Sequence, residues 1–514
     1  MMQMFQTISK NIGLFGTRLR DRTSFTIKNG MVTMLMIVTS MLLPFIIISG
    51  NGNVVFALST LIIISVVFVS FYRLHWGFYI FIVLVFAADG YDIAGLRPWT
   101  YTIYYLMTFN VIFKGLGVGV LTPMELHLIF LVFVWIFIVV VKKDVKLQPV
   151  PIWGPALLCF SWLIGSVVYG SMRGGDPMMA LWEVRALSYL AILFFFVPQI
   201  INRKEHIQTI FWIFIWGISF KAYQAIDRFV RLGFDFGGKR TLSNHEDPLF
   251  FVTLFFLLLG LITYGGHVRQ KKALTYLTLP LLIGFYVANR RATYAAFAVG
   301  VIMLILLLTK EQRQKSLKYL MAFGFVFVIY LAVYWNSYGR IAMVASAVKS
   351  TYFSAIGDTK NINYADYTSG LARDQENYNL AVTLRNAPIL GIGFGKQHEW
   401  VIMNYGSFAL KGYITHNEIL WLITKSGAIG FFLFFFFINC IILRGALVFI
   451  KLNDPYLRVA CAVCIIAVFG QIVVSYVDMQ LTFFRNMVHL GILTGMIPVI
   501  ERVDKNLNVD TNIS

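Results

Sequence analysis

The sequence predicts an all-α, polytopic transmembrane helical bundle of about 12 to 14 spans, with one long extracytoplasmic loop between late spans. The first observation is composition: of 514 residues 58% are hydrophobic and only 13% are charged, whereas soluble domains carry about a quarter charged residues. The second is an aromatic content of 16%, which suits side chains that face lipid tails and headgroups. The third is the recurrence of apolar runs of about 20 residues, the length of one membrane span. Disordered, collagen-like and disulfide-rich secreted chains are excluded.

The formal net charge of +19 is interpreted as the positive-inside bias of membrane proteins. In a soluble protein the same excess would favour nucleic-acid binding. No recognition motif for nucleic acid stands on a segment that could leave the membrane, so no nucleic-acid partner is expected.

The N-terminal segment 1–30 is polar and basic, and the first apolar run starts only at Met31. A secretory signal peptide has a shorter apolar core and a small-residue cleavage site. We therefore expect a signal anchor or first span whose N-terminus lies in the cytoplasm.

The predicted spans follow from the length rule. Segment 101–122 is apolar but contains Lys114 and the run GLGVG, and it is interpreted as re-entrant or interfacial. The spans are expected near residues 31–50, 54–72, 74–88, 124–141, 152–170, 181–200, 206–224, 248–265, 273–289, 292–309, 317–335, 420–443, 457–476 and 485–500.

The loop charges orient this layout. Nearly every short connection on one side carries Lys or Arg, so that side and both termini are expected in the cytoplasm. The expected regions are a basic cytoplasmic segment 1–30, an N-terminal transmembrane bundle 31–335, a long periplasmic loop 336–416, C-terminal transmembrane helices 417–500 and a cytoplasmic tail 501–514. A loop of this length is usually functional.

The segment in which the long loop returns to the membrane reads Tyr-Ile-Thr-His-Asn-Glu-Ile-Leu (413–420). Thr415 and Glu418 have the spacing of a capping box, a purely structural motif. His416 would then lie in the first helical turn, where the helix dipole favours a neutral imidazole. A neutral imidazole outside the membrane suits a general base for a hydroxyl group.

Arginines on the predicted outer face form a second group of candidates. Arg290 and Arg291 lie between two spans, Arg185 lies one turn into its span near Glu183, and Arg240 precedes the next span. An arginine within a span is a functional candidate by default, and a guanidinium binds diphosphate oxygens bidentately. The structural alternatives are an ion pair of Arg185 with Glu183, and snorkelling to the interface.

The remaining sequence patterns are too weak to predict a metal or a cofactor site, so neither group is expected. The run Gly-Ile-Gly-Phe-Gly (391–395) lies on the outer side, where no ATP is available, and is interpreted as a turn. Asp374-Gln375-Glu376 is the nearest approach to an acidic metal-binding pair, and we interpret it instead as a solvated loop.

Four segments together carry a resemblance to a known family. They are Thr-His-Asn-Glu with its apolar helix and Gly-x-x-Gly (415–432), the stretch 385–395 that ends in Pro-x-x-Gly-x-Gly, Arg291-Ala292 at the start of a span, and Leu-Thr-Pro-Met-Glu-Leu (121–126). In order and type they resemble the O-antigen ligase and O-antigen polymerase superfamily of bacterial membrane glycosyltransferases.

The resemblance implies a metal-independent, inverting glycosyltransferase, multi-pass in the bacterial inner (plasma) membrane, with its active site facing the periplasm. The donor would be a glycan on undecaprenyl diphosphate. His416 matches the family's base and Arg291 its diphosphate-binding arginine, whereas Arg185 corresponds more loosely. The position of Arg290 lies beside a Gly or another small residue in most family patterns. The hypothesis is that Arg291, with Arg185, Arg290 and Arg240, stabilises the leaving diphosphate.

The acceptor hydroxyl stays open. It would belong to a lipid A core in a ligase, to another lipid-linked repeat in a polymerase, or to a protein side chain in a third branch. The His-Asn motif favours the ligase type, with polysaccharide polymerase as the runner-up. A lipid-linked glycan transporter is the alternative of a different class, although the sequence shows no inverted pair of broken helices.

Overall fold

A computed structural model of the chain describes residues 64–89, 92–103, 105–108, 121–141, 146–236, 241–337, 339, 341–358, 364–403 and 410–513, together with residues 37, 40, 41, 44 and 48. Most of the predicted span 31–50, much of 54–72, residues 109–120 of the predicted re-entrant segment and Arg240 lie outside these residues.

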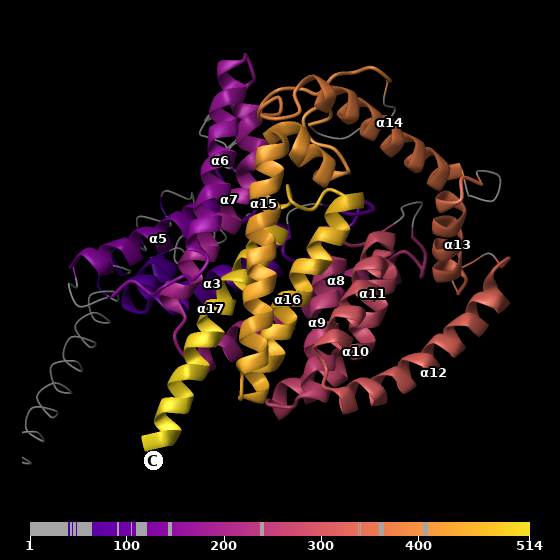
Figure 1. Ribbon diagram of the computed structural model, residues 1–514. Helices are drawn as coiled ribbons and strands as arrows, with labels where there is room; N and C mark the ends of the chain where they lie inside the picture. Colours follow the sequence, from indigo (N-terminus) through magenta and orange to yellow (C-terminus); the bar gives the residue numbers. More distant parts are fainter. Residues whose placement is uncertain are drawn as a thin grey trace, which may run out of the picture. The chain divides into compact units, whose positions relative to one another are not determined.

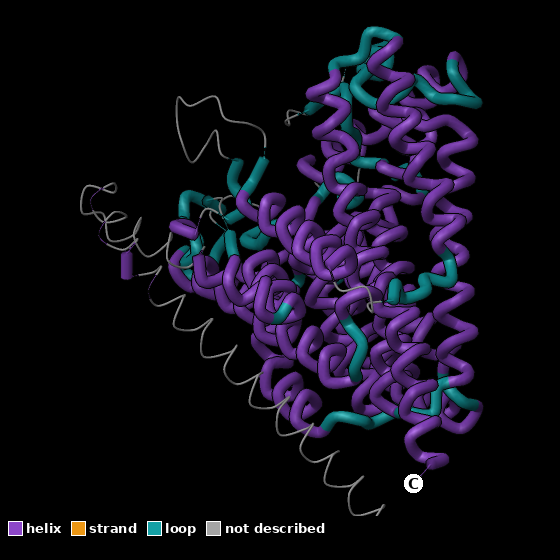
Figure 2. Tube along the Cα trace, turned by 90° about the vertical axis from the view of Figure 1, so that its left-hand side faces the viewer, coloured by secondary structure: helices purple, strands orange, loops and turns teal. Residues whose placement is uncertain are grey.

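The described chain is helical throughout and contains no strand, only two isolated backbone bridges (Figure 2). In chain order its elements are α3 (Leu74–Ala87), the 3₁₀ turn η1 (Tyr101–Ile103), α5 (Pro123–Val141), α6 (Trp153–Met172), α7 (Pro177–Ile200), α8 (Lys204–Arg231), α9 (Asp247–Thr263), α10 (Val268–Ala288), α11 (Arg291–Leu307), α12 (Lys310–Tyr334), α13 (Met343–Ala355), α14 (Tyr364–Asn386), α15 (Glu418–Lys451), α16 (Pro455–Val477) and α17 (Phe484–Ile513).

The predicted fold class is confirmed. Every predicted span from residue 74 onward coincides with one helix, since long apolar runs in lipid must satisfy their backbone groups internally. Within the described residues, seven helices are long and apolar enough to cross a membrane by length and composition. The chain is an all-α polytopic membrane protein.

The chain divides into two units. The first comprises Met1–Phe81 and Met124–Val141, and the second comprises Ile82–Pro123 and Lys142–Ser514. In the first unit the ring of Phe81 meets His127 of α5 edge-on, with ring centroids 5.7 Å apart. The described candidate site residues all belong to the second unit.

Helices of the second unit pack in pairs, chiefly α7 with α17, α11 with α16, α8 with α10, and α15 with both α6 and α16. Helix α16 is buried on nearly all sides. Helix α12, in contrast, has no buried residue, and Figure 1 shows it approaching other helices only near its ends. Its apolar surface therefore faces lipid.

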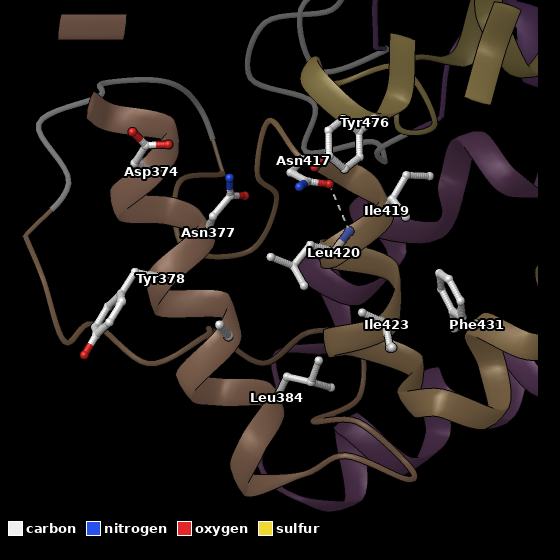
Figure 3. A pocket seen from close by; sticks show the side chains of 11 residues that line it. Asp374, Asn377, Tyr378, Leu384, Asn417, Ile419, Leu420, Ile423, Phe431 and Tyr476 are labelled. Carbon is white, nitrogen blue, oxygen red and sulfur yellow. Dashed lines mark hydrogen bonds between the residues drawn. The ribbon is translucent and has the colours of Figure 1, made fainter. Parts of the chain in front are cut away.

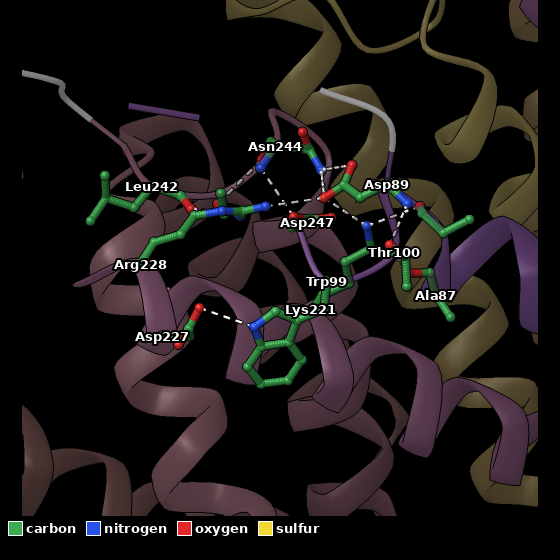
Figure 4. Close-up of polar contacts among 12 residues, drawn as sticks. Ala87, Asp89, Trp99, Thr100, Lys221, Asp227, Arg228, Leu242, Asn244 and Asp247 are labelled. Atoms are coloured by element: carbon green, nitrogen blue, oxygen red, sulfur yellow. Dashed lines mark hydrogen bonds and ion pairs between the residues drawn. The ribbon is translucent and has the colours of Figure 1, made fainter. Parts of the chain in front are cut away.

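A cluster of buried charges joins the loop after α3 to α8, α9 and α17 (Figure 4). The carboxylate of Asp89 lies 3.0 Å from Lys221, 3.5 Å from Arg228 and 3.2 Å from Arg485, and it accepts hydrogen bonds from Asn244. Burial alone would raise the pKa of Asp89, but the neighbouring cations lower it overall. With Glu246 and Asp247 beside Arg485, three acids face three bases, so the cluster is balanced and structural.

Candidate functional site

Helix α14 organises the candidate site. The segment predicted as a long loop contains two helices, α13 and α14, and Figure 1 shows α14 near the end of the bundle where α15 begins, with α13 at the side of the bundle. Asp366, Arg373 and Glu376 follow one another along α14. Spacings of seven and three residues place successive members on neighbouring parts of one helix face.

His416 contacts Glu376 directly. The backbone N–H of His416 donates to Oε2 of Glu376 at 3.0 Å, and Nδ1 of the ring lies 2.9 Å and 3.1 Å from the two carboxylate oxygens. Glu376 is only 2% exposed. The interpretation of Asp374-Gln375-Glu376 as a solvated loop was therefore wrong for Glu376, because the carboxylate is buried against the histidine.

Asn417 caps helix α15, since its side-chain oxygen accepts the N–H of Leu420 at 3.0 Å. The predicted capping box of Thr415 and Glu418 is therefore wrong, and His416 lies before the cap instead of in the first turn. The carboxylate of Glu418 instead accepts N–H groups of the turn between α16 and α17, which offers several unpaired amide donors.

Arg291 opens α11 and reaches across to α13 and α14. Its guanidinium lies 3.4 Å from Asp366 and donates to the hydroxyl of Ser350 at 3.2 Å. The Ser350 hydroxyl in turn donates to Asp366 at 2.7 Å. The Arg291 side chain keeps 29% of its surface accessible, so a ligand can still reach it.

Arg290 is the N-cap residue of α11, and its guanidinium lies 3.7 Å from Asp478 at the end of α16. Asp478 also lies 3.7 Å from Nδ1 of His245. Burial raises the pKa of Asp478, but the contact with His245 and the nearby charges of Arg290 and Arg373 lower the pKa to about 2. Asp478 is therefore ionised and holds Arg290 next to α14.

Arg373 is a site residue that the sequence did not single out. Its Nε atom is buried and, among the residues that the structure describes, has no hydrogen-bond partner. Its charge lies close enough to Asp478 to lower the pKa of that carboxylate. The helical period of 364–386, had it been recognised, would have placed Arg373 one turn from Glu376.

Of the remaining two predicted arginines, the structure describes only Arg185. Arg185 lies on α7, with its guanidinium 4.6 Å from the ring centroid of Trp182. Glu183, its suggested partner, forms an ion pair with Lys425 of α15. Arg240 lies outside the described residues.

The glycine-rich segment 391–395 forms a turn, as predicted, and anchors α15. Helix α15 breaks at Gly427, which has φ 71°, so carbonyl oxygens before the break lose their helical partners. The N–H groups of Ile392 and Gly393 donate to two of them at 3.0 Å and 2.9 Å. The glycine-rich turn is thereby hydrogen-bonded to the first part of α15, the helix that begins just after His416.

A pocket of about 690 Å³ opens between α14 and α15 (Figure 3). From α14 both polar and apolar residues line it, and Figure 3 shows Asn377 on the side toward α15, whereas α15 contributes mainly apolar side chains. Asn417, the neighbour of His416, lies at its rim. The lining residues are Asp374, Asn377, Tyr378, Ala381, Leu384, Asn417, Ile419, Leu420, Ile423, Phe431 and Tyr476.

Residues 276–435 match a family model described as O-antigen ligase. The matched segment contains Arg290, Arg291, α13, α14 and His416, and so most of the geometry described above. No curated protein matches the chain. The family comprises membrane glycosyltransferase-like enzymes that act on lipid-linked glycans. The chain is therefore a multi-pass membrane protein whose segment 276–435 is similar to the O-antigen ligase family.

Proposed function

We propose that the chain is an O-antigen ligase-like glycosyltransferase that moves a glycan from undecaprenyl diphosphate to an acceptor hydroxyl. The reaction would take place at the periplasmic face of the bacterial inner membrane. One observation carries the proposal: a single helix, α14, contacts Arg291 through Asp366 and His416 through Glu376. The candidate base His416 and the candidate anion-binding residue Arg291 are thus both in contact with α14.

In the proposed reaction His416 accepts the proton of the acceptor hydroxyl, and the oxygen attacks the anomeric carbon of the donor. The bond from that carbon to the diphosphate oxygen breaks, so one displacement inverts the anomeric configuration and needs no metal. Arg291, Arg290 and Arg373 stabilise the charge that grows on the leaving diphosphate. By analogy with loss of an oxyanion-hole donor, each contact contributes about 2.7–4 kcal/mol.

The pocket between α14 and α15 suits the lipid part of such a donor. Its α15 side offers Ile419, Leu420 and Ile423, and an isoprenoid chain gains free energy by leaving water for such a surface. We assign to Arg185 and Arg240 supporting contacts with the diphosphate. Their alanine variants test this assignment, because each variant should bind the donor less tightly.

The first test is a gel of surface glycolipids and lipid-linked intermediates from cells that produce His416→Ala. A ligase variant would strand long glycans on the lipid carrier. His267→Ala is the matched control, because His267 caps the end of α10 away from Arg290. An unchanged gel with well-folded His416→Ala protein would remove the base assignment.

The same gel addresses the second candidate, a polysaccharide polymerase of the same superfamily. Single repeats that never lengthen in the His416→Ala cells would favour the polymerase. Transport of a lipid-linked glycan across vesicles by purified protein, without glycan transfer, would favour a transporter instead.

A further inference from the structure

We infer that Glu376 is a positioning residue that fixes the tautomer and the orientation of the His416 ring. The inference rests on the proposed function, in which His416 is the base. It concerns a residue that neither the sequence motifs nor the family match assigns to any role.

The geometry of the contact selects one tautomer. An ionised carboxylate has only acceptor sites, and both oxygens of Glu376 lie within 3.1 Å of Nδ1 of His416. The ring therefore carries its hydrogen on Nδ1 and keeps a lone pair on Nε2, the nitrogen that a base needs. Because Glu376 also accepts the backbone N–H of His416 at 3.0 Å, one carboxylate holds both the main chain and the ring.

Glu376 and His416 differ in how far their side chains are buried. The Glu376 side chain is 3% exposed, whereas the His416 side chain is 23% exposed. Water is thus largely excluded from the carboxylate, which strengthens its hydrogen bonds, and the imidazole stays within reach of an acceptor.

The buried face of α14 keeps Glu376 in place. Asn379 and Thr383, three and seven residues further on, lie on this face and are 0% and 1% exposed. Asn379 accepts the N–H groups of Val401 and Ile402 at 3.1 Å and 2.9 Å. These bonds bind α14 to the following loop, so the helix cannot rotate Glu376 away from His416 without breaking them.

His398, a nearby histidine, does not carry a positive charge that would compete with His416 for Glu376. Burial and, to a smaller extent, the charge of Lys425 together lower the pKa of His398 to about 4, although Glu376 opposes both effects. His398 is therefore neutral at neutral pH.

The kinetic test compares Glu376→Gln with Glu399→Gln. Glu399 is an exposed carboxylate on the same outer segment, which accepts a hydrogen bond from Asn386. A glutamine amide can donate to Nδ1 and so select the wrong tautomer. We expect Glu376→Gln to lower kcat about 10²–10⁴-fold, the range of general-base catalysis, with KM for the donor unchanged. Glu399→Gln should retain activity, and Glu376→Asp should recover part of kcat.

The double variant His416→Ala with Glu376→Gln separates positioning from stability. Groups that act as a unit lose little more together than singly. We expect its residual turnover to equal that of His416→Ala alone, measured on protein whose thermal unfolding in detergent is checked. A further, multiplied loss, or an increase in KM without a decrease in kcat, would overturn the inference.

A spectroscopic measurement tests the pairing without activity. The chain has 8 histidines, so ¹⁵N NMR of histidine-labelled protein identifies the His416 signals by their loss in His416→Ala. We expect hydrogen on Nδ1 in the wild type and on Nε2 in Glu376→Gln. Hydrogen on Nε2 in the wild type would overturn the inference. Hydrogen on Nδ1 together with full activity of His416→Ala would leave the pairing intact and remove the proposed function.

Discussion

Glu183 of α7 and Lys425 of α15 form an ion pair at 2.6 Å in which both side chains are fully buried. Glu183 also accepts the N–H of Gly395, and Lys425 donates to the carbonyl oxygen of Lys396. The pair therefore joins two helices to the glycine-rich turn, and Lys425 follows His416 by nine residues in the sequence. The position of the candidate base depends on this pair.

Replacement of one partner should destabilise the protein strongly. Lys425→Met leaves a buried carboxylate without its cation, which costs about 3–5 kcal/mol in comparable cases. The double variant Glu183→Leu with Lys425→Met removes both charges and should recover part of that loss. Thermal unfolding in detergent measures both variants. Equal midpoints for the single and double variants would show that the charge is compensated elsewhere.

Arg373 should contribute more to donor binding than Arg385, another arginine of α14. Arg373→Ala removes a guanidinium whose Nε is buried beside Asp478, and kcat/KM should fall about 10²–10³-fold, as for loss of one oxyanion donor. Arg385 is exposed in the last turn of α14, so Arg385→Ala is the matched control. Steady-state kinetics with a lipid-diphosphate donor test this, and equal effects of both substitutions would exclude a specific role.

Gly393→Ala should disturb the turn that holds α15. Gly393 has φ 84°, a conformation that a side chain disfavours by about 1–3 kcal/mol. An added Cβ would also lie 2.3 Å from the Cα of Gly170 in α6, so one backbone must move. Gly370→Ala on α14 meets nothing within 4 Å, and its unfolding midpoint should equal or exceed that of the wild type, since Ala favours a helix over Gly. A wild-type midpoint for Gly393→Ala would show that the turn is not fixed against α6.

The membrane helices could be predicted because length and apolarity determine them locally. Helix α14 could not, because it is polar and is held by distant partners, such as Asn379 with the loop at 401–402. The prediction of a long extracytoplasmic loop over 336–416 therefore did not include this helix.

The candidate site was predictable only in part, for the same reason. Arg291 and His416 stand in short motifs, whereas the partner Glu376 lies 40 residues from His416 in sequence. The capping box failed because Asn417 is an equally good capping residue, and tertiary contacts gave Glu418 better donors.

Acid should loosen the segment between α14 and α15 through His398. Its folded-state pKa is about 4, lowered chiefly by burial from the ordinary 6.5. Between these values the unfolded chain binds a proton that the folded chain does not, so the free energy of unfolding falls as pH falls, by up to about 1.4 kcal/mol per pH unit. Above pH 6.5 the contribution is complete and constant.

His398→Phe isolates this effect from the other titrating groups. Phenylalanine can keep the stacking on Trp400, whose ring centroid lies 5.4 Å from that of His398, but it cannot bind a proton. Unfolding midpoints of the two proteins, measured from pH 7.5 to pH 4, should diverge below about pH 6.5, with the wild type falling faster. Parallel curves would show that His398 takes up its proton in the folded protein without cost, and hence that the segment around Trp400 already admits water.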